Sequence, residues 1–230
     1  MLLYLVTAGL SLAAAVRPVL PGDVAVSRAV QSIDFQGVGR LERAGYFIGS
    51  FEGIVTLGIV IVAGLLLARR FADAGLLAGA LVLRGTNPSI KGLIQSARPT
   101  DDLVRVAENA TKDPGTFGFP SGHAMGTVLL FGGIIYLAQV HVRSTRLRIA
   151  LQAVSLLLIF LVGWSRIYSG AHWITDTLGG VLWGLALLTP DPDSPAGHRN
   201  RQTFPRRTRH RSMIDRGYAP GRTTKIGSVE

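Results

Sequence analysis

The sequence contains no cysteine, and only 17% of its 230 residues are charged. The missing cysteines exclude a disulfide-stapled scaffold, a thiolate metal site and a cysteine nucleophile. So few charges beside 48% hydrophobic residues exclude an intrinsically disordered chain. Acidic residues are the scarcer charge, because 14 Asp and Glu stand against 24 Lys and Arg. The chain is thus basic and yet apolar, with a mean hydropathy of +0.35, whereas a soluble nucleic-acid-binding protein is basic and hydrophilic.

Apolar segments joined by basic loops produce this combination, which is typical of a multi-span membrane protein. A helix that crosses the hydrocarbon layer needs about 20 mostly apolar residues, and six segments approach this length. They run from Met1 to about Leu20, about Tyr46 to Ala68, Phe71 past Lys91, His123 to about Val142, about Leu147 to Trp164, and about His172 to Thr189. The sequence therefore predicts an all-α, integral-membrane bundle of six helices, with residues 1–189 as one domain.

The first and last parts of the chain each leave an alternative open. The Ala13-Ala14-Ala15 run also suits a cleaved signal peptide, but no basic residue precedes the apolar stretch, so a spanning helix is favoured. Residues 190–230 are polar and basic, and they predict a disordered cytoplasmic tail. The basic run at residues 206–211 suits anionic lipid head groups or nucleic acid. A solvated tail that fixes topology is the simpler interpretation, and no nucleic-acid partner is expected.

Two further patterns concern packing. Apolar residues recur at helical spacing from Val26 to Leu41, which predicts one short amphipathic helix on the membrane surface, with an ordinary loop helix as the alternative. Glycines four residues apart favour close helix contacts in lipid. These glycines are Gly45/Gly49/Gly53, Gly75/Gly79, Gly122/Gly126 and Gly180/Gly184.

The short basic loops predict the orientation in the membrane. With six spans, the pair Arg69-Arg70 and the run at residues 143–148 lie on the same side as both termini. Lys and Arg accumulate in cytoplasmic loops, so both termini are expected in the cytoplasm of a cell-membrane protein. The loops at residues 21–45, 99–122 and 164–171 are then expected to face outward.

Polar residues cluster near span ends on that outward side, where charges are costly and indicate function. Lys91 and Arg98 are seven residues apart, which predicts two turns of one helix face ended by Pro99. The remaining members are Pro120-Ser121-Gly122-His123 before the fourth span, Ser165-Arg166 at the end of the fifth, and His172 with Asp176 at the start of the sixth.

The composition of this cluster favours phosphate over a metal ion. Two histidines and an aspartate suggest a metal site, but Lys91, Arg98 and Arg166 would repel a cation and bind a phosphoryl group. The helix N-terminus at Ser121-Gly122 adds N–H donors. The sequence therefore predicts phosphoryl chemistry with no metal and no cofactor.

The two histidines are expected to have different roles. Only His172 has a carboxylate one helical turn away, Asp176, which would set its tautomer and free the other ring nitrogen for attack. His172 is therefore the predicted nucleophile and forms a phosphohistidine. His123, at a helix start, is the predicted acid that protonates the leaving group and later the base that activates water.

The three motifs resemble those of the type 2 phosphatidic acid phosphatases. They are Lys91-(six residues)-Arg98-Pro99, Pro120-Ser121-Gly122-His123 and Ser165-Arg166-(five residues)-His172-(three residues)-Asp176, present in order. The resemblance covers about residues 46–189. One departure is visible, because many members carry a second Arg-Pro pair where this chain has Ser96-Ala97.

The resemblance implies an α-helical, metal-independent lipid phosphate phosphatase with an extracytoplasmic site. It assigns phosphate binding to Lys91, Arg98, Ser121, Gly122 and Arg166, and catalysis to His123, His172 and Asp176. A vanadium-dependent haloperoxidase and a non-catalytic lipid-phosphate binder or transporter share such motifs and are the alternatives. The expected partners are membrane lipids and a lipid phosphate substrate. Undecaprenyl diphosphate, phosphatidic acid and phosphatidylglycerophosphate all fit, and the sequence indicates no oligomeric state.

Overall fold

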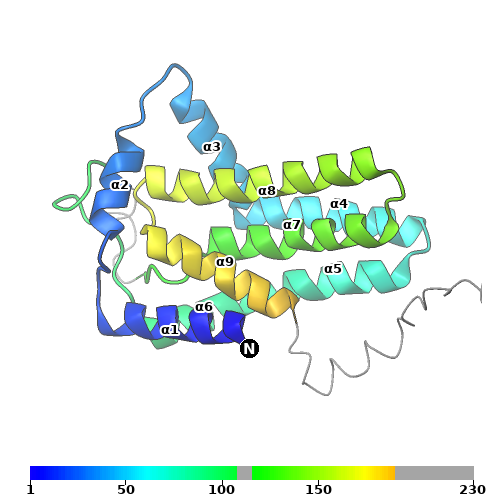
Figure 1. The fold of residues 1–230 in the computed structure, drawn as a ribbon, viewed down its shortest axis with the longest axis horizontal. Coiled ribbons are helices and arrows are strands. Elements are labelled where there is room, and N and C mark those ends of the chain that lie inside the picture. The colour runs from blue at the N-terminus through cyan, green and yellow to red at the C-terminus, as the bar shows by residue number, and fades with distance from the viewer. Residues whose placement is uncertain (108–115, 190–230) are drawn as a thin grey trace, which may run out of the picture. The chain divides into compact units, whose positions relative to one another are not determined.

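In the computed structural model, residues 1–107 and 116–189 are described, all within one compact unit, and they form helices without any strand among them (Figure 1). The α-helices are α1 (Leu2–Val16), α2 (Asp23–Gln31), α3 (Val38–Gly49), α4 (Phe51–Leu67), α5 (Phe71–Leu83), α6 (Asn87–Ile94), α7 (Gly122–His141), α8 (Thr145–Tyr168) and α9 (Ile174–Leu188), with a 3₁₀ turn η1 (Arg84–Thr86) between α5 and α6. The serines Ser50, Ser121 and Ser144 cap α4, α7 and α8, because each side chain accepts a backbone N–H three residues on. The predicted tail, residues 190–230, lies outside the described residues.

Each of the six predicted apolar segments contains a helix, so the all-α bundle is confirmed, while the number of spans is approximate. Within the described ranges, α7 and α8 are each long and apolar enough to cross a membrane. The pair α3 and α4 passes the same test as one span bent by 60° at Ser50. Helices α1 and α9 are apolar but shorter, at 15 residues each.

Two local predictions are wrong. The amphipathic segment between the first two spans is not one helix but two, because α2 ends at Gln31 and α3 begins after Gly37. Gly37 has a φ of 102°, a backbone conformation that glycine adopts easily and other residues rarely do. The helix that carries Lys91 also stops early. It ends at Ile94 because Gln95 adopts a left-handed φ of 56°, so Arg98 lies in a segment without regular secondary structure rather than on the same helix face.

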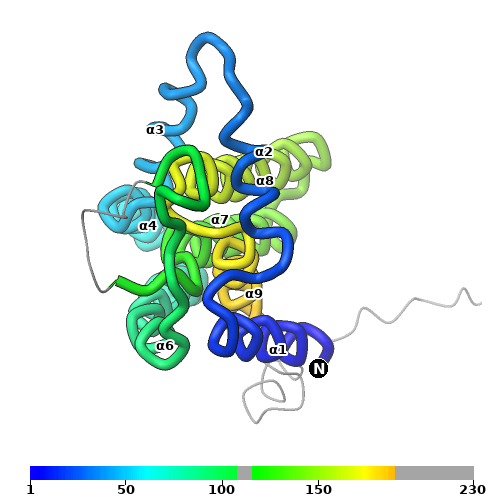
Figure 2. Tube along the Cα trace, turned by 90° about the vertical axis from the view of Figure 1, so that its left-hand side faces the viewer, coloured from blue at the N-terminus to red at the C-terminus, as the bar shows by residue number. Residues whose placement is uncertain are grey.

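Helix α7 lies in the middle of the bundle, between α4, α8 and α9 in the end-on view (Figure 2). This position explains why one side chain after another along α7 is buried, from Ala124 to Phe131. Leu130 and Phe131 pack with Ile54 of α4 and Leu77 of α5 in one apolar cluster. The central helix thereby holds its first residues, Gly122 and His123, in a fixed place among the surrounding helices.

The predicted glycine contacts are confirmed at some positions and wrong at others. A Cβ on Gly180 would lie 2.5 Å from Ser121 O, and one on Gly184 2.8 Å from Val128, so α9 needs both glycines to approach α7. A Cβ on Gly45 would lie 2.7 Å from Ser165 Cβ, which brings α3 onto α8 in the same way. At Gly75 and Gly79 the described chain leaves open space, so that pair serves no helix contact.

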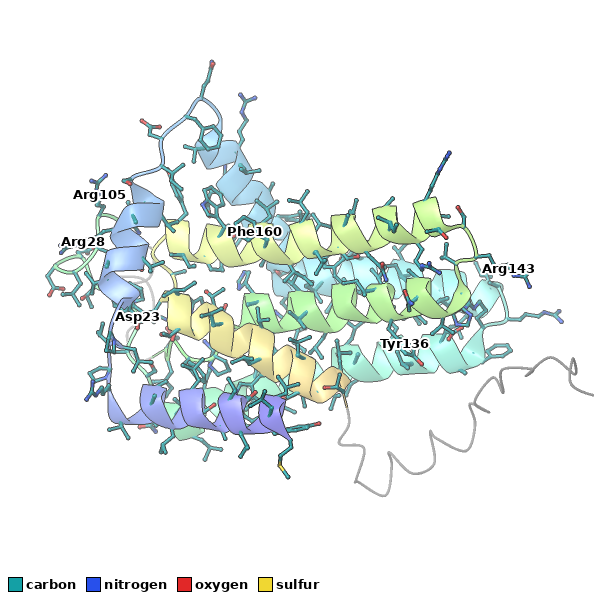
Figure 3. The ribbon with its side chains drawn as sticks, viewed as in Figure 1. Asp23, Arg28, Arg105, Tyr136, Arg143 and Phe160 are labelled. Atoms are coloured by element: carbon teal, nitrogen blue, oxygen red, sulfur yellow. The ribbon has the colours of Figure 1, made fainter. Side chains whose placement is uncertain are left out.

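The segments that connect the long helices lie at two opposite ends of the bundle, as Figure 3 shows for Arg28 of α2 and Arg105 at one end and Arg143 at the other. At the second end, Asp73 at the start of α5 binds Arg70 and, at 3.1 Å, His141 at the end of α7. At the first end, Arg28 Nε donates to Leu103 O at 2.7 Å. The connections between successive apolar segments thus lie alternately at the two ends of the bundle, as the six-segment prediction requires (Figure 1).

Candidate active site

A polar pocket of about 230 Å³ opens at the end of the bundle where α7 and α9 begin and α8 ends. Its lining residues are Tyr46, Arg84, Asn87, Lys91, Arg98, Gly122, His123, Arg166, Ala171 and His172. Six of the eight residues predicted for the site are among them. The other two, Ser121 and Asp176, lie directly behind the wall and are buried, at 0% and 1% exposure. Tertiary folding thus brings all three motifs to one place.

His172 and Asp176 form a buried pair. His172 lies in the turn between α8 and α9, and its Nδ1 is 3.3 Å from Asp176 Oδ2. The same Oδ2 accepts the Trp173 backbone N–H at 3.0 Å, which fixes the carboxylate at the start of α9. Burial, together with the positive charges of Lys91 and Arg98, holds the pKa of His172 well below its usual range. This direction favours the neutral imidazole, whose Nε2 is suited to act as a nucleophile.

His123 is the second histidine of the pocket and belongs to the first turn of α7. Its ring lies against Tyr46 of α3, with the ring centroids 5.4 Å apart. Its Nε2 is buried and has no hydrogen-bond partner within the described part of the chain. A ring nitrogen in this condition can exchange a proton with a group that enters the pocket, as a general acid or base must.

Lys91 and Arg98 reach the pocket from different local structures, because α6 ends between them. Lys91 Nζ donates to Phe117 O at 2.7 Å, and Arg98 donates to Ala171 O at 2.9 Å. The two cations therefore hold the segment before α7 and the turn before α9 while their charges face the pocket. This geometry is consistent with the prediction that both residues serve one site. They meet there through tertiary contacts, and not because their spacing places them on one helix face.

Arg166, in the last turn of α8, has partners that the motif does not reveal. Its side chain is 2% exposed, donates to Glu42 Oε1 at 3.0 Å, and lies over the Tyr46 ring at 4.6 Å. Glu42 and Tyr46 both belong to α3, which the sequence predicted only as part of a surface helix and a span start. No local sequence signal connects α3 to Arg166, so only the fold reveals this contact.

The start of α7 lies at the same pocket, where Gly122 and His123 are lining residues. Ser121 caps the helix, with its Oγ accepting from Ala124 N at 3.4 Å, and its own N–H donates to Asp176 O at 2.9 Å. Gly122 allows a close approach, because a Cβ there would lie 2.9 Å from Asn87 Oδ1. The positive end of a helix dipole thus adds to the side-chain cations and favours an anion.

Asp23 is a structural residue of the site that sequence reasoning missed. It begins α2, is 1% exposed, and accepts from Thr175 N at 3.2 Å and Thr175 Oγ1 at 2.9 Å. It therefore ties α2 to the start of α9, one turn from His172. The apolar residues around it suggested only an amphipathic helix, and nothing in the local sequence indicated burial.

An apolar groove of about 690 Å³ lies between α4 and α5, beside the polar pocket. Its walls include Ile54 and Val62 of α4 and Leu81 of α5. The groove and the pocket share Arg84, Asn87 and Gly122 as lining residues. A polar pocket rich in cations thus borders an apolar groove of the kind that a lipid chain occupies.

The charges around the two histidines decide the chemistry of the pocket. Four cations, Arg84, Lys91, Arg98 and Arg166, surround the histidines, and Asp176 is already engaged with His172. Within the described ranges, no group of three or more His, Cys, Asp or Glu side chains is placed to hold a metal ion. A phosphoryl group, whose negative charge spreads over its oxygens, fits this environment.

Comparisons with known proteins agree with this geometry. Residues 73–190 match the family model of the PAP2 superfamily. The chain is 30% identical to phosphatidylglycerophosphatase B of Bacillus subtilis over 186 residues, which cover 78% of this chain and 87% of that protein. Lipid phosphate phosphatase delta of Arabidopsis thaliana is 30% identical over 105 residues, 43% of this chain and 25% of that protein.

Two solved structures share the fold. The crystal structure of a transmembrane PAP2 type phosphatidylglycerolphosphate phosphatase from Bacillus subtilis superimposes with a TM-score of 0.70 at 23% identity, covering 89% of this chain and 96% of that one. The crystal structure of Aquifex aeolicus LpxE superimposes with a TM-score of 0.55 at 20% identity, covering 74% of this chain and 93% of that one.

The family and the class of enzyme predicted from the motifs, a membrane phosphatase, are confirmed by these relatives. The match covers the part of the chain that carries all three motifs, and the similarity to a curated relative extends over most of both proteins. The chain belongs to the PAP2 superfamily.

Proposed function

We propose that this protein is an integral-membrane, metal-independent phosphatase that hydrolyses lipid phosphates or diphosphates through a phosphohistidine. The observation that carries the proposal is the pocket itself, in which a neutral His172 held by Asp176 and an unpartnered His123 Nε2 are surrounded by cations. The apolar groove between α4 and α5 supports a lipid substrate, since it shares Arg84, Asn87 and Gly122 with this pocket.

In the first step, His172 Nε2 attacks the phosphorus of the terminal phosphate. A bond forms between nitrogen and phosphorus, and the bond from phosphorus to the leaving oxygen breaks while His123 gives that oxygen a proton. Lys91, Arg98 and Arg166, with the N–H groups at the start of α7, stabilise the charge on the equatorial oxygens. Asp176 stabilises the cationic imidazole that forms on His172.

In the second step, water attacks the phosphohistidine. His123, now neutral, accepts a proton from that water, the bond between nitrogen and phosphorus breaks, and inorganic phosphate leaves. His172 returns to the neutral imidazole that the buried position favours. Each histidine is thus restored at the end of the cycle.

The orientation that fits this function places the pocket outside the cytoplasm and both termini inside. Its support is the charge of the short loops. Arg143 lies at the end of the bundle away from the pocket (Figure 3), and Arg70 lies at the same end because its partner Asp73 also binds His141.

The proposal is tested by phosphate release from lipid phosphates with detergent-solubilised protein and by two variants. His172→Ala should be inactive on every substrate. His123→Ala should nearly lose lipid phosphate cleavage, because general acid catalysis contributes about 10²–10⁴-fold with a poor leaving group. Nitrophenyl phosphate needs no such acid, so this variant should release a burst of nitrophenolate and then turn over slowly.

Rapid-mixing kinetics on both variants decides the assignment. A burst from His172→Ala would exclude it as the nucleophile. Equal losses on both substrates in His123→Ala would exclude its role as the acid. Lipid binding without phosphate release by the unaltered protein would favour a non-catalytic binder.

A further inference from the structure

Arg84 occupies the junction between the polar pocket and the apolar groove. It begins the 3₁₀ turn η1 that breaks the third apolar segment, and it lines both cavities. It belongs to none of the three motifs. A fourth cation is therefore placed on the path from the lipid chain to the phosphate pocket.

The Arg84 guanidinium differs from the other cations of the pocket in its partners. Lys91, Arg98 and Arg166 each donate to a protein oxygen, at Phe117 O, Ala171 O and Glu42 Oε1 respectively. Arg84 Nε, in contrast, is buried and has no hydrogen-bond partner among the described residues.

The surroundings of Arg84 hold the side chain without neutralising it. Its guanidinium carbon lies 4.9 Å from the Phe51 ring centroid, a cation–π contact. Gly126 leaves room for it, because a Cβ there would lie 2.5 Å from Arg84 Nε. Glu52 is a neighbouring carboxylate on α4, but it is exposed, and it forms no ion pair with Arg84 in the described structure.

An unsatisfied donor of a charged group is costly to bury, so this site is suited to an anionic ligand. The phosphate that is cleaved has its own binding groups around His123 and His172. An anion at Arg84 would instead lie on the groove side of that phosphate, toward the lipid chain.

We propose that Arg84 binds a second phosphate of the substrate, located between the phosphate that is cleaved and the lipid chain. This inference rests on the proposed function and names the substrate class of the same site. Two kinds of lipid present such a group: a lipid diphosphate, and a lipid whose terminal phosphate follows a phosphodiester. A lipid with a single terminal phosphate presents none.

For a diphosphate, the contact also assists the reaction. When His172 attacks the terminal phosphorus, the bond to the bridging oxygen breaks and its electron pair stays on the lipid monophosphate. Arg84 would stabilise that growing charge, while His123 protonates the bridging oxygen. For a phosphodiester lipid, Arg84 would bind the second phosphate without taking part in bond cleavage.

The experiment measures kcat/KM for two matched pairs of substrates with the purified protein in detergent. One pair is undecaprenyl diphosphate and undecaprenyl monophosphate, and the other is phosphatidylglycerophosphate and phosphatidic acid. The variants are Arg84→Met, which removes the donors, and Arg84→Lys, which keeps the charge. Arg43→Met is the matched control, since Arg43 is exposed on α3 and donates to Gly39 O of its own helix.

In Arg84→Met, the preference for the substrate with two phosphates should fall by about tenfold or more in at least one pair, and Arg84→Lys should retain part of it. A fall in the first pair identifies the diphosphate, and a fall in the second identifies the phosphodiester. Arg43→Met should leave both ratios unchanged.

Equal losses on both members of each pair, or no change in either ratio, would overturn the proposal. If Arg84→Met fails to fold, as judged by gel filtration, the ratios of Arg84→Lys decide in the same way. Cleavage of the single-phosphate lipids by the unaltered protein tests the proposed function separately, because it does not depend on Arg84.

Discussion

Arg166 donates to Glu42 across 124 positions of the chain, at 3.0 Å. The contact joins the last turn of α8, which carries a motif residue, to α3, which carries none. We therefore propose that Glu42 is a positioning residue, which orients the Arg166 guanidinium before a phosphate binds. The Tyr46 ring, 4.6 Å away, supports the same guanidinium from one side.

Replacing Glu42 with alanine should lower kcat/KM by about tenfold, because Arg166 loses the charge-assisted bond that orients it. The Glu42→Gln variant keeps an acceptor oxygen, so its kcat/KM should lie between those of the unaltered protein and Glu42→Ala. Steady-state kinetics and the inhibition constant for vanadate measure the effect, with Asp34→Asn at an exposed position as the control. Tighter vanadate binding in Glu42→Ala would show instead that the carboxylate competes with phosphate.

Asp176→Asn should lower turnover by about 10³-fold or more while the fold is retained. The amide would no longer orient His172 or stabilise its cationic form, as when the orienting acid of a catalytic triad is removed. Turnover and circular dichroism on the purified variant check both parts. Near-normal turnover would mean that Asp176 serves only to hold the start of α9.

Asp23→Ala should destabilise the protein by about 1–3 kcal/mol, because Thr175 N and Leu20 N would lose their buried acceptor. Asp23→Asn keeps one acceptor oxygen and should lose less. Thermal unfolding in detergent measures the change, with Asp34→Asn again as an exposed control. An unchanged unfolding temperature in Asp23→Ala would contradict the role of this residue as the link between α2 and α9.

Chelators should leave activity intact, and vanadate should inhibit it. The reason is the positive pocket, which favours an anion shaped like the phosphoryl transition state over a metal cation. Phosphate release is measured with and without EDTA, and then across a range of vanadate concentrations. Loss of activity in EDTA that magnesium or zinc restores would defeat this interpretation.

Single cysteines can map the orientation cleanly, because the chain has none of its own. Asp101→Cys, in an exposed loop at the pocket end, should react with an impermeant maleimide in intact cells, and Ser144→Cys should not. Both should react after the cells are opened, which controls for accessibility. Labelling of Ser144→Cys alone would invert the orientation.

The helical class and the membrane setting follow from the sequence alone, because they depend on local composition. Long apolar segments form helices wherever the backbone must satisfy its own hydrogen bonds. The boundaries are less well predicted, as α3 and α4 show with their 60° bend at Ser50. A break of this kind depends on packing against neighbours, and a hydropathy pattern does not contain that information.

The eight predicted site residues follow from the order and spacing of three motifs, because reactive and phosphate-binding groups are identifiable by residue type. Their convergence in one pocket, and the positions of Glu42, Tyr46 and Arg84 beside them, were decided only by the tertiary structure. Lys91 and Arg98 illustrate the difference. Their seven-residue spacing suggested one helix face, yet the helix ends between them at Ile94, and both cations meet in the pocket through contacts with distant backbone oxygens. Charge and chemistry are properties of a residue, whereas the partners that orient it come from segments far away in the chain, and only folding brings those together.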